Sequence, residues 1–379
     1  LSKFDDLSHV FVIAEAGSNW KAGTSDEDVL RAKQLIDIAA QSGADAIKFQ
    51  TYRPETLYVQ NAGQSDYLAK HGIDQNINDI FKNLSMPYEM IPELAEYAKK
   101  QKIIFMSTPF SVNDAKEVDP FVDIHKIASF EINHVRLVEF LAKTKKPLII
   151  STGASTYDEI DFAVNLIKKN NNNNIRILQC TSKYPCPLNA LNLSVIPKIK
   201  SRYDLPVGFS DHSIDPIIAP IIAVAYGATV IEKHFTLDRN LPGPDHPFAL
   251  IPNELEVMVN SIRNAELTLG SGDKQILKEE LELRNFATRS LQTIKTISKG
   301  DVLEEGINFD VLRPGKCNRG LEARFLQSVN GKRSKTDIDV GNGVLDYEWA
   351  LVYGDELLWT MILKIWIKKL KKIETELKN

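Results

Sequence analysis

Eight short runs of apolar, largely β-branched residues recur through the first part of this chain, and each run ends in polar or reactive side chains. They are VFVIAEAG (10–17), AIKFQTY (46–52), IIFMSTPF (103–110), IHKIAS (124–129), PLIISTG (147–153), IRILQCTS (175–182), VGFSDHS (207–213) and TVIEKHFT (229–236). Such runs predict strands. Packing gives a buried strand no reason to collect charges at one end, whereas the active site of a (β/α)8 barrel lies at the carboxyl ends of all eight strands. The pattern therefore predicts an enzyme built on a TIM barrel.

Segments with helical periodicity fill the gaps between these runs, at 26–42, 87–101, 134–144, 156–169, 214–226 and 253–269. In the first segment, Ser25 or Asp26 is the expected N-cap and Gly43 the expected C′ residue. Strand–helix alternation implies parallel strands joined by right-handed crossovers. The long gap at 53–102 is expected to carry a loop over the barrel mouth, and the polar run 168–174 a solvated turn without function.

The chain has 379 residues, enough for a barrel of about 250 residues and one smaller domain. We expect a barrel at 1–270, a linker at 271–288, a small β-rich module at 289–348 and a basic amphipathic tail at 349–379. The apolar run in the tail is about half as long as a membrane span requires. It predicts a helix that packs on the body or on a partner, with a membrane-surface helix or a poorly ordered tail as alternatives.

Composition excludes several classes of protein. The net charge of −4 gives no electrostatic case for nucleic-acid binding. Three scattered cysteines without a CxxC pair do not form a disulfide framework or a cysteine zinc site. The N-terminal residues show no apolar signal region, so a cytoplasmic location is expected.

Two histidines end adjacent predicted strands. His212 closes the seventh run and His234 the eighth. Neighbouring strands lie about 4.8 Å apart, so both imidazoles can approach one ion at about 2.1 Å. Such a pair with open positions suits a divalent transition metal, whereas a single histidine is more often structural.

Lysines and serines at the other strand ends predict an anion site. The candidates are Lys48, Lys126, Lys233, Ser129, Ser151 and Ser210, with loop amides near Gly153. Converging ammonium, hydroxyl and amide donors suit a phosphate together with a carboxylate. Two alternatives stay open: ion pairs of the lysines with Glu15, Glu131 and Glu232, or a Schiff-base lysine.

Three carboxylates are candidates for sugar binding or proton transfer. Glu15 ends the first run beside Gly17, and Glu131 follows the fourth. Asp245 and Tyr184 follow the eighth and sixth runs, where they are expected to line a polyol pocket. A solvated loop is the alternative for Asp245.

The chain resembles the sialic acid synthase family, phosphoenolpyruvate-dependent enzymes that make nonulosonic acids. The matching stretches are AEAGSNWKAG, IKFQTY, STPF, HKIASFE, ISTG, CTSKYP, GFSDHS, IEKHFTLDRNLPGPDH and VLRPG, spread in order over about 340 residues. The resemblance implies a (β/α)8 TIM barrel followed by an antifreeze-like (SAF) domain at 289–348. It also implies a reaction in which phosphoenolpyruvate condenses with an open-chain N-acylated hexosamine.

The resemblance also implies roles for individual residues. His212 and His234 would hold a divalent metal, with Mn²⁺ expected first and Co²⁺ or Mg²⁺ as alternatives. Phosphoenolpyruvate would be bound by Lys48, Lys126, Ser129, Ser151, Ser182 and Ser210. The amino sugar would contact Glu15, Gln50, Tyr184, Asp245 and Arg313, with Glu15 and Glu131 as catalytic carboxylates. Arg313 would reach the sugar's N-acyl group from the partner's SAF domain in a domain-swapped homodimer.

The chain departs from the family pattern at several positions. Trp20 stands where the family often has histidine, and Ser182 where some members have asparagine. Phe130 lengthens the turn formed by the Lys-Ile-Ala-Ser residues, a feature shared with pseudaminic acid synthases. The run 242–246 instead resembles sialic and legionaminic acid synthases. The sugar is thus N-acetylmannosamine or a diacetamido-deoxyhexose. The rival functions are a Schiff-base pyruvate aldolase using Lys126 or Lys233, and a non-catalytic sugar-binding protein.

Overall fold

The computed structural model of the chain describes residues 2–60, 62–64 and 76–347. The chain divides into two compact units, Leu1–Gly272 and Asp273–Asn379, which are described separately. The tail expected at 349–379 lies outside the described residues. Within the described part of the chain, no helix is long and apolar enough to cross a bilayer.

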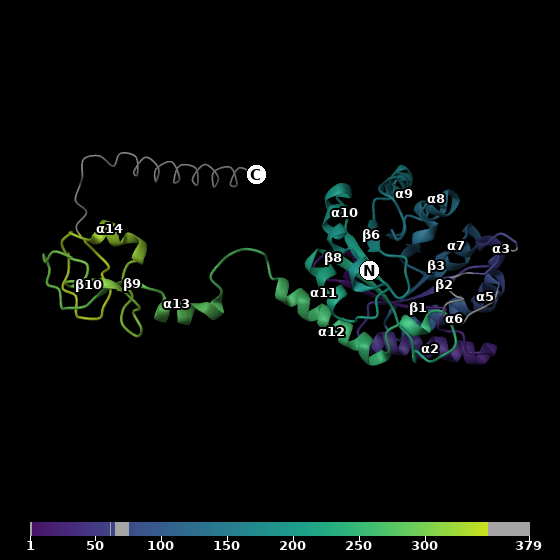
Figure 1. The fold of residues 1–379 in the computed structure, drawn as a ribbon, viewed down its shortest axis with the longest axis horizontal. Coiled ribbons are helices and arrows are strands. Elements are labelled where there is room, and N and C mark those ends of the chain that lie inside the picture. The colour runs from purple at the N-terminus through teal and green to yellow at the C-terminus, as the bar shows by residue number, and fades with distance from the viewer. Residues whose placement is uncertain (1, 61, 65–75, 348–379) are drawn as a thin grey trace. The chain divides into compact units, whose positions relative to one another are not determined.

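The first unit is a nearly closed, TIM-like barrel of eight parallel strands (Figure 1). The strands follow the order β3-β2-β1-β8-β7-β6-β5-β4, and the end strands β3 and β4 contact each other. All eight predicted strands are confirmed. They are β1 (Phe11–Gly17), β2 (Ala46–Thr51), β3 (Ile104–Pro109), β4 (His125–Ile127), β5 (Leu148–Ser151), β6 (Ile175–Cys180), β7 (Val207–Asp211) and β8 (Ala228–His234).

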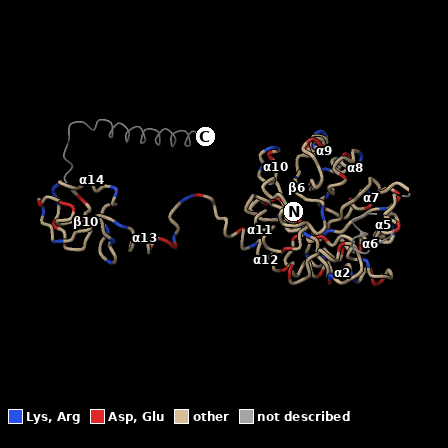
Figure 2. Tube along the Cα trace, viewed as in Figure 1, with Lys and Arg blue, Asp and Glu red and all other residues tan. Residues whose placement is uncertain are grey.

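Helices cover the outside of this barrel, as the periodic segments predict. They are α2 (Ser25–Gln41), α6 (Met90–Lys100), α7 (Val112–Val118), α8 (Val135–Lys143), α9 (Tyr157–Lys169), α10 (Ile196–Tyr203), α11 (Ile218–Ala225) and α12 (Pro252–Leu269). The predictions lacked α7 and α10, which have 7 and 8 residues. Two further helices, α3 (Pro54–Leu57) and α5 (Ile77–Leu84), lie in the long gap between β2 and β3. Acidic and basic residues are interspersed over the helices (Figure 2).

Two local predictions are wrong. Helix α2 is capped by Thr24, not by Ser25 or Asp26, because Glu27 completes a capping box with Thr24. The expected C′ residue Gly43 does adopt a left-handed conformation with φ of 80°. The polar turn after α9 is not wholly solvated, since Asn172 is buried and donates to the carbonyl of Lys146 at 2.9 Å.

The N-terminal segment closes the bottom of the barrel. Phe4, in the short helix α1 (Ser2–Asp5), is fully buried and packs edge-on against Phe11, with ring centroids 5.2 Å apart. The guanidinium of Arg176 lies 3.7 Å from the centroid of the Phe4 ring. Aromatic contacts of this kind close the interior at the amino ends of the strands.

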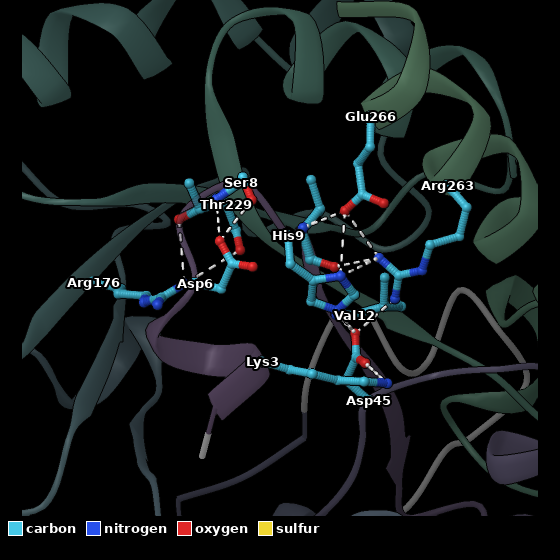
Figure 3. Close-up of polar contacts among 11 residues, drawn as sticks. Lys3, Asp6, Ser8, His9, Val12, Asp45, Arg176, Thr229, Arg263 and Glu266 are labelled. Atoms are coloured by element: carbon cyan, nitrogen blue, oxygen red, sulfur yellow. Dashed lines mark hydrogen bonds and ion pairs between the residues drawn. The ribbon is translucent and has the colours of Figure 1, made fainter. Parts of the chain in front are cut away.

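A polar network fixes this segment to the rest of the barrel (Figure 3). Its centre is the buried Asp45, which accepts hydrogen bonds from Lys3 at 2.9 Å, from Val12 N at 3.0 Å and from Arg263 at 2.7 Å. The His9 ring nitrogen lies 2.9 Å from the same carboxylate. The network thereby joins the chain start to β1, the start of β2 and α12.

The second unit is small and rich in extended backbone. It contains α13 (Leu281–Ala287), the antiparallel strands β9 (Ser290–Thr293) and β10 (Phe309–Leu312), and α14 (Leu326–Val329). Its apolar core is separate and is formed by Leu291, Ile297, Leu303, Phe309, Val329, Ile338, Val344 and Tyr347. A Cβ atom on Gly343 would lie 1.9 Å from the backbone nitrogen of Gly320, so this crossing of two chain segments requires glycine.

We predict that Phe4→Ala lowers the free energy of unfolding by about 3–5 kcal/mol, because it leaves a cavity between Phe11 and Arg176. Urea unfolding followed by circular dichroism measures the change. The control is Leu267→Ala in α12, where the side chain is 82% exposed and the expected change is within about 0.5 kcal/mol. Equal stabilities of the two variants would contradict the structural role of Phe4.

Candidate active site

The interior of the barrel changes from apolar to polar over two residues in every strand. Interior apolar residues form one cluster: Phe11, Ile13, Ala46, Met106, Ile124, Ile149, Leu178 and Val230. Because side chains alternate along a strand, the residue two positions later also points inward. Those residues are Glu15, Lys48, Thr108, Lys126, Ser151, Cys180 and Glu232, and in β7 Gly208 is followed by Ser210. The same alternation brings Gln50, His212 and His234 to the mouth.

These side chains line one cavity of about 610 Å³ at the carboxyl ends of the strands. Most of the predicted site residues meet there: Glu15, Lys48, Gln50, Lys126, Ser129, Glu131, Ser151, Tyr184, Ser210, His212, His234 and Asp245. Ser182 lines an adjoining cavity of about 550 Å³. Arg313 belongs to the second unit, directly after β10.

The two lysines of the cavity lie beside carboxylates. Lys48 Nζ is 2.5 Å from Glu15 Oε2 and 3.6 Å from Glu232 Oε2, and it donates to Thr108 at 3.0 Å. Lys126 Nζ is 3.9 Å from Glu232 Oε1. Lys48 therefore forms the ion pair with a carboxylate that was expected as an alternative to anion binding. Lys126 lies beside a carboxylate only at a longer distance. An incoming anion would compete with these carboxylates.

Burial and charge set the protonation of this cluster. Burial alone would raise the pKa of Glu232, but Lys126 and Lys48 outweigh it and lower that pKa to about 2. Burial raises the pKa of Glu15 to about 7, against the attraction of Lys48. Near neutral pH, the two lysines thus face one fully ionised carboxylate and one partly protonated carboxyl. This balance favours a bound anion.

Hydroxyl groups surround Gly153 on the other side of the cavity. Gly153 N donates to Ser129 Oγ at 2.9 Å. A Cβ atom on Gly153 would lie 2.2 Å from Ser182 Oγ, so a larger residue here would displace that hydroxyl. Among the described residues, the buried hydroxyls of Ser151 and Ser182 have no hydrogen-bond partner. Buried polar groups without partners are costly, and an anion in the cavity would satisfy them.

The two histidines fit a partial metal site. The His212 and His234 ring centroids are 5.7 Å apart, a separation that one ion with bonds of about 2.1 Å can span. His212 Nδ1 donates a hydrogen bond to the carbonyl of Thr181 at 2.9 Å, which leaves Nε2 as the ligand atom. Burial lowers the pKa of His234 well below its usual value, so the ring is neutral. The described residues contain no group of three or more metal-ligating side chains, so water or substrate would complete the coordination.

Loop residues border the histidines. The Tyr184 ring lies 4.1 Å from the His212 ring and 5.2 Å from the Phe248 ring, measured between centroids. Asp245 Oδ2 accepts hydrogen bonds from Ser18 N at 3.1 Å and from Ser18 Oγ at 2.9 Å. The alternative of a solvated loop is therefore wrong for Asp245, whose carboxylate is held at the cavity.

The third predicted lysine, Lys233, lies outside the cavity. It points to the opposite side of β8 and donates to Asp211 at 2.7 Å, to Ser213 Oγ at 3.1 Å and to the carbonyl of Asp215 at 3.1 Å. These bonds hold the loop that carries His212. The structure therefore argues against Lys233 as part of the anion site or as a Schiff-base lysine.

Several lining residues were absent from the predicted site, namely Glu232, Thr108 and Cys180. Each lies two positions after an interior apolar residue, so the alternation of the strands would have identified them. Cys180 Sγ lies 3.8 Å from His212 Nδ1. Trp20 is buried in the apolar core between strands and helices and does not line the cavity.

Comparisons with known proteins agree on one family. A profile of the NeuB family matches residues 35–274. The chain is 39% identical to the spore coat polysaccharide biosynthesis protein SpsE of Bacillus subtilis, over 89% of this chain and 92% of that protein. It is 36% identical to the pseudaminic acid synthase of Campylobacter jejuni, over 92% of this chain and 99% of that protein. The crystal structure of the N-acetylneuraminic acid synthetase of Leptospira borgpetersenii in complex with citrate is similar, with a TM-score of 0.64 and 35% identity over 73% of this chain and 92% of that one.

We predict that Glu131→Gln reduces the loss of stability that accompanies rising pH. Burial raises the pKa of Glu131 from 4.5 to about 7. Between these values the unfolded chain releases the proton and the folded chain keeps it, so wild-type stability falls as pH rises. The side chain keeps 9% of its surface exposed, so the contribution is on the order of 1–2 kcal/mol. Urea unfolding at about pH 5 and about pH 8 measures it. The same pH dependence in both proteins would argue against a buried carboxyl.

We predict that His234→Ala weakens Mn²⁺ binding at least about tenfold, because it removes one of two imidazole ligands. Titration calorimetry measures the affinity, and circular dichroism should show an unchanged fold. The control is His134→Ala, since His134 caps α8 and does not line the cavity. Unchanged affinity in His234→Ala would exclude this metal site.

Proposed function

The chain belongs to the NeuB family of nonulosonic acid synthases, and we propose that it condenses phosphoenolpyruvate with the open-chain form of an N-acylated hexosamine. Water enters the reaction, and phosphate and a nonulosonic acid leave. The sugar is N-acetylmannosamine or a diacetamido-deoxyhexose. The observation that carries the proposal is the meeting of two buried lysines, several hydroxyls and two histidines in one cavity.

The anion cluster is suited to phosphoenolpyruvate. Lys48 and Lys126 supply two cationic donors, and Ser129, Ser151, Ser182 and Ser210 supply hydroxyls for the carboxylate and phosphate. The buried, unpartnered hydroxyls of Ser151 and Ser182 support this assignment. When the ligand binds, Lys48 exchanges a carboxylate partner for the substrate.

His212 and His234 would hold a divalent ion, with Mn²⁺ proposed first and Co²⁺ or Mg²⁺ as alternatives. When bound, such an ion polarises a carbonyl oxygen. The neutral ring of His234 is available as a ligand, and the hydrogen bond from His212 Nδ1 to the carbonyl of Thr181 leaves Nε2 of that ring for the ion. These residues thereby orient the aldehyde of the sugar.

Carbon–carbon bond formation begins when C3 of phosphoenolpyruvate attacks the aldehyde carbon of the sugar. Positive character develops at C2 of the former enol, next to its own phosphate and the carboxylates of the cavity. Water adds at C2, and the resulting tetrahedral centre expels phosphate. The aldehyde oxygen gains a proton and the attacking water loses one. Glu131, with a pKa raised by burial to about 7, is suited to move a proton, and Glu15 is the second candidate.

The amino sugar is proposed to contact Glu15, Gln50, Tyr184 and Asp245 on the side of the cavity nearest the loops. Gln50 Nε2 donates to Glu15 Oε1 at 2.9 Å, which fixes both side chains. Asp245 is fixed by Ser18. Because their side chains are already held in place, these groups would bind the sugar hydroxyls without a change of side-chain conformation.

We also propose that the second unit is an antifreeze-like (SAF) domain at 289–348, joined to the 1–270 barrel by a 271–288 linker. Its small β-rich core and the VLRPG sequence after β10 support this assignment. Arg313 would bind the N-acyl group of the sugar in the partner's barrel, within a domain-swapped homodimer. Enclosure by this domain would exclude water from the reactive centre.

One rival function has a specific observation in its favour. Burial lowers the pKa of Lys126, and a desolvated lysine is suited to form a Schiff base with free pyruvate. A single pair of assays separates the two functions. The synthase releases phosphate from phosphoenolpyruvate when Mn²⁺ and an N-acylated hexosamine are present, and borohydride with pyruvate traps no adduct. A trapped adduct on Lys126, without phosphate release, would establish the aldolase instead.

We predict that Lys48→Ala and Lys126→Ala each lower kcat/KM for phosphoenolpyruvate about tenfold to a hundredfold. Each removes a charged contact worth about 1.5–3 kcal/mol. Steady-state phosphate release measures the effect, and Lys198→Ala, at an exposed position on α10, serves as the control. If either variant weakened only the apparent affinity for the sugar, the lysines would belong to a different subsite.

A further inference from the structure

Lys233 is a buried charge that the proposed reaction does not use. Its side chain is 1% exposed and lies outside the catalytic cavity. Its Nζ donates to Asp211 Oδ2 at 2.7 Å, to Ser213 Oγ at 3.1 Å, and to the carbonyls of Ser213 and Asp215. These acceptors satisfy all three protons of the ammonium group. Every one of them belongs to the short segment 211–215, which contains His212.

The ion pair between Lys233 and Asp211 lies directly before the two proposed metal ligands. In the parallel pairing of β7 with β8, Asp211 is the register partner of Lys233. His212 follows the aspartate in the chain, and His234 follows the lysine. The pair therefore joins the two strands at the last paired position before their histidines. A change in this pairing would move one imidazole relative to the other.

Both oxygens of the Asp211 carboxylate act on the loop that carries His212. Oδ2 accepts from Lys233, and Oδ1 accepts from Ser213 N at 2.7 Å. Ser213 is also bonded to Lys233 through its hydroxyl and its carbonyl. The residues before and after His212 are thus both bound to one ammonium group, which fixes the backbone of this histidine on both sides.

The two histidine rings differ in their own hydrogen bonds. His212 Nδ1 donates to the carbonyl of Thr181 at 2.9 Å, which orients that ring. Among the residues that the structure describes, the buried Nδ1 of His234 has no hydrogen-bond partner. Metal-binding histidines usually depend on such an outer partner for their orientation. The placement of His234 relative to His212 therefore depends more strongly on the backbone of the paired strands.

We infer that Lys233, through its ion pair with Asp211, is a positioning residue that sets the separation of His212 and His234. The pair thereby sets the affinity of the site for a divalent ion. The inference rests on the proposed function, because it concerns the metal site proposed there. Lys233 itself contacts neither the ion nor a substrate. Removal of its ammonium group would release the 211–215 segment and leave the lysines and hydroxyls of the cavity in place.

The first test compares Lys233→Met with the wild-type chain by titration calorimetry. We expect Mn²⁺ binding to weaken about tenfold to a hundredfold, the usual effect of losing an outer-shell partner at a metal site. Phosphoenolpyruvate binding to the metal-free protein should stay unchanged, because Lys48 and Lys126 keep their positions. Unchanged Mn²⁺ affinity would overturn the inference. An equal loss of both ligands would also overturn it, since that result indicates a general structural role.

A matched control separates positioning from loss of stability. Arg263→Met removes the cationic partner that lies 2.7 Å from the buried Asp45 carboxylate at the bottom of the barrel. We expect this variant to lower the free energy of unfolding and to leave Mn²⁺ affinity unchanged. A comparable loss of Mn²⁺ affinity in the control would attribute the effect of Lys233→Met to stability and overturn the inference.

A double variant keeps the test decisive if the single variant folds poorly. Lys233→Met leaves Asp211 buried without its cationic partner, which is destabilising, whereas Lys233→Met with Asp211→Leu removes both charges. We expect the double variant to be more stable than Lys233→Met and still to bind Mn²⁺ at least about tenfold more weakly than the wild-type chain. Recovery of both stability and affinity would overturn the inference. If the wild-type chain bound no Mn²⁺, the proposed metal site would itself be wrong.

Discussion

The alternation of side chains along parallel strands is the constraint on which the rest of this molecule depends. In each of the eight strands the inward position that is apolar, or glycine in β7, is followed two residues later by a polar or thiol side chain at the mouth. A single-residue shift in any strand would exchange that side chain for one that faces the helices. Lys233 illustrates this, because its neighbour Glu232 faces the cavity while Lys233 binds a loop outside it.

Placing so many charges inside a barrel requires mutual compensation. Lys48, Lys126, Glu15 and Glu232 are almost completely buried, and each would be strongly destabilising alone. Ion pairs, together with hydrogen bonds from Ser210 and Gln50, reduce this cost while the cavity holds no substrate. The same groups remain imperfectly satisfied, because Glu232 lies 3.6 Å from Lys48 Nζ and 3.9 Å from Lys126 Nζ, beyond hydrogen-bond distance. Such residual cost is typical of sites that bind a charged ligand.

Much of the barrel was predictable from the sequence because period-two and helical patterns are local. The eight strands, six of the helices and the meeting of His212 with His234 followed from them. The N-cap of α2 was misplaced because the deciding feature was the Glu27 side chain, and Asn172 was misjudged because its partners lie in another loop. The carboxylates that lie beside Lys48 and Lys126 could not be assigned from the sequence, because the pairing depends on how the strands pack. The adjoining cavity depends on α5 and on the loop after β8, which are far apart in the sequence.

The closure of the barrel bottom has a consequence for how the chain folds during synthesis. Phe4 leaves the ribosome long before Arg176, whose side chain covers it and belongs to β6. Arg263, which binds Asp45, follows that residue by 218 positions. Contacts of such long sequence separation form late and slowly. The nascent chain must therefore keep the Phe4 ring from other partners until most of the barrel has emerged, and partial chains would expose open sheet edges prone to aggregation.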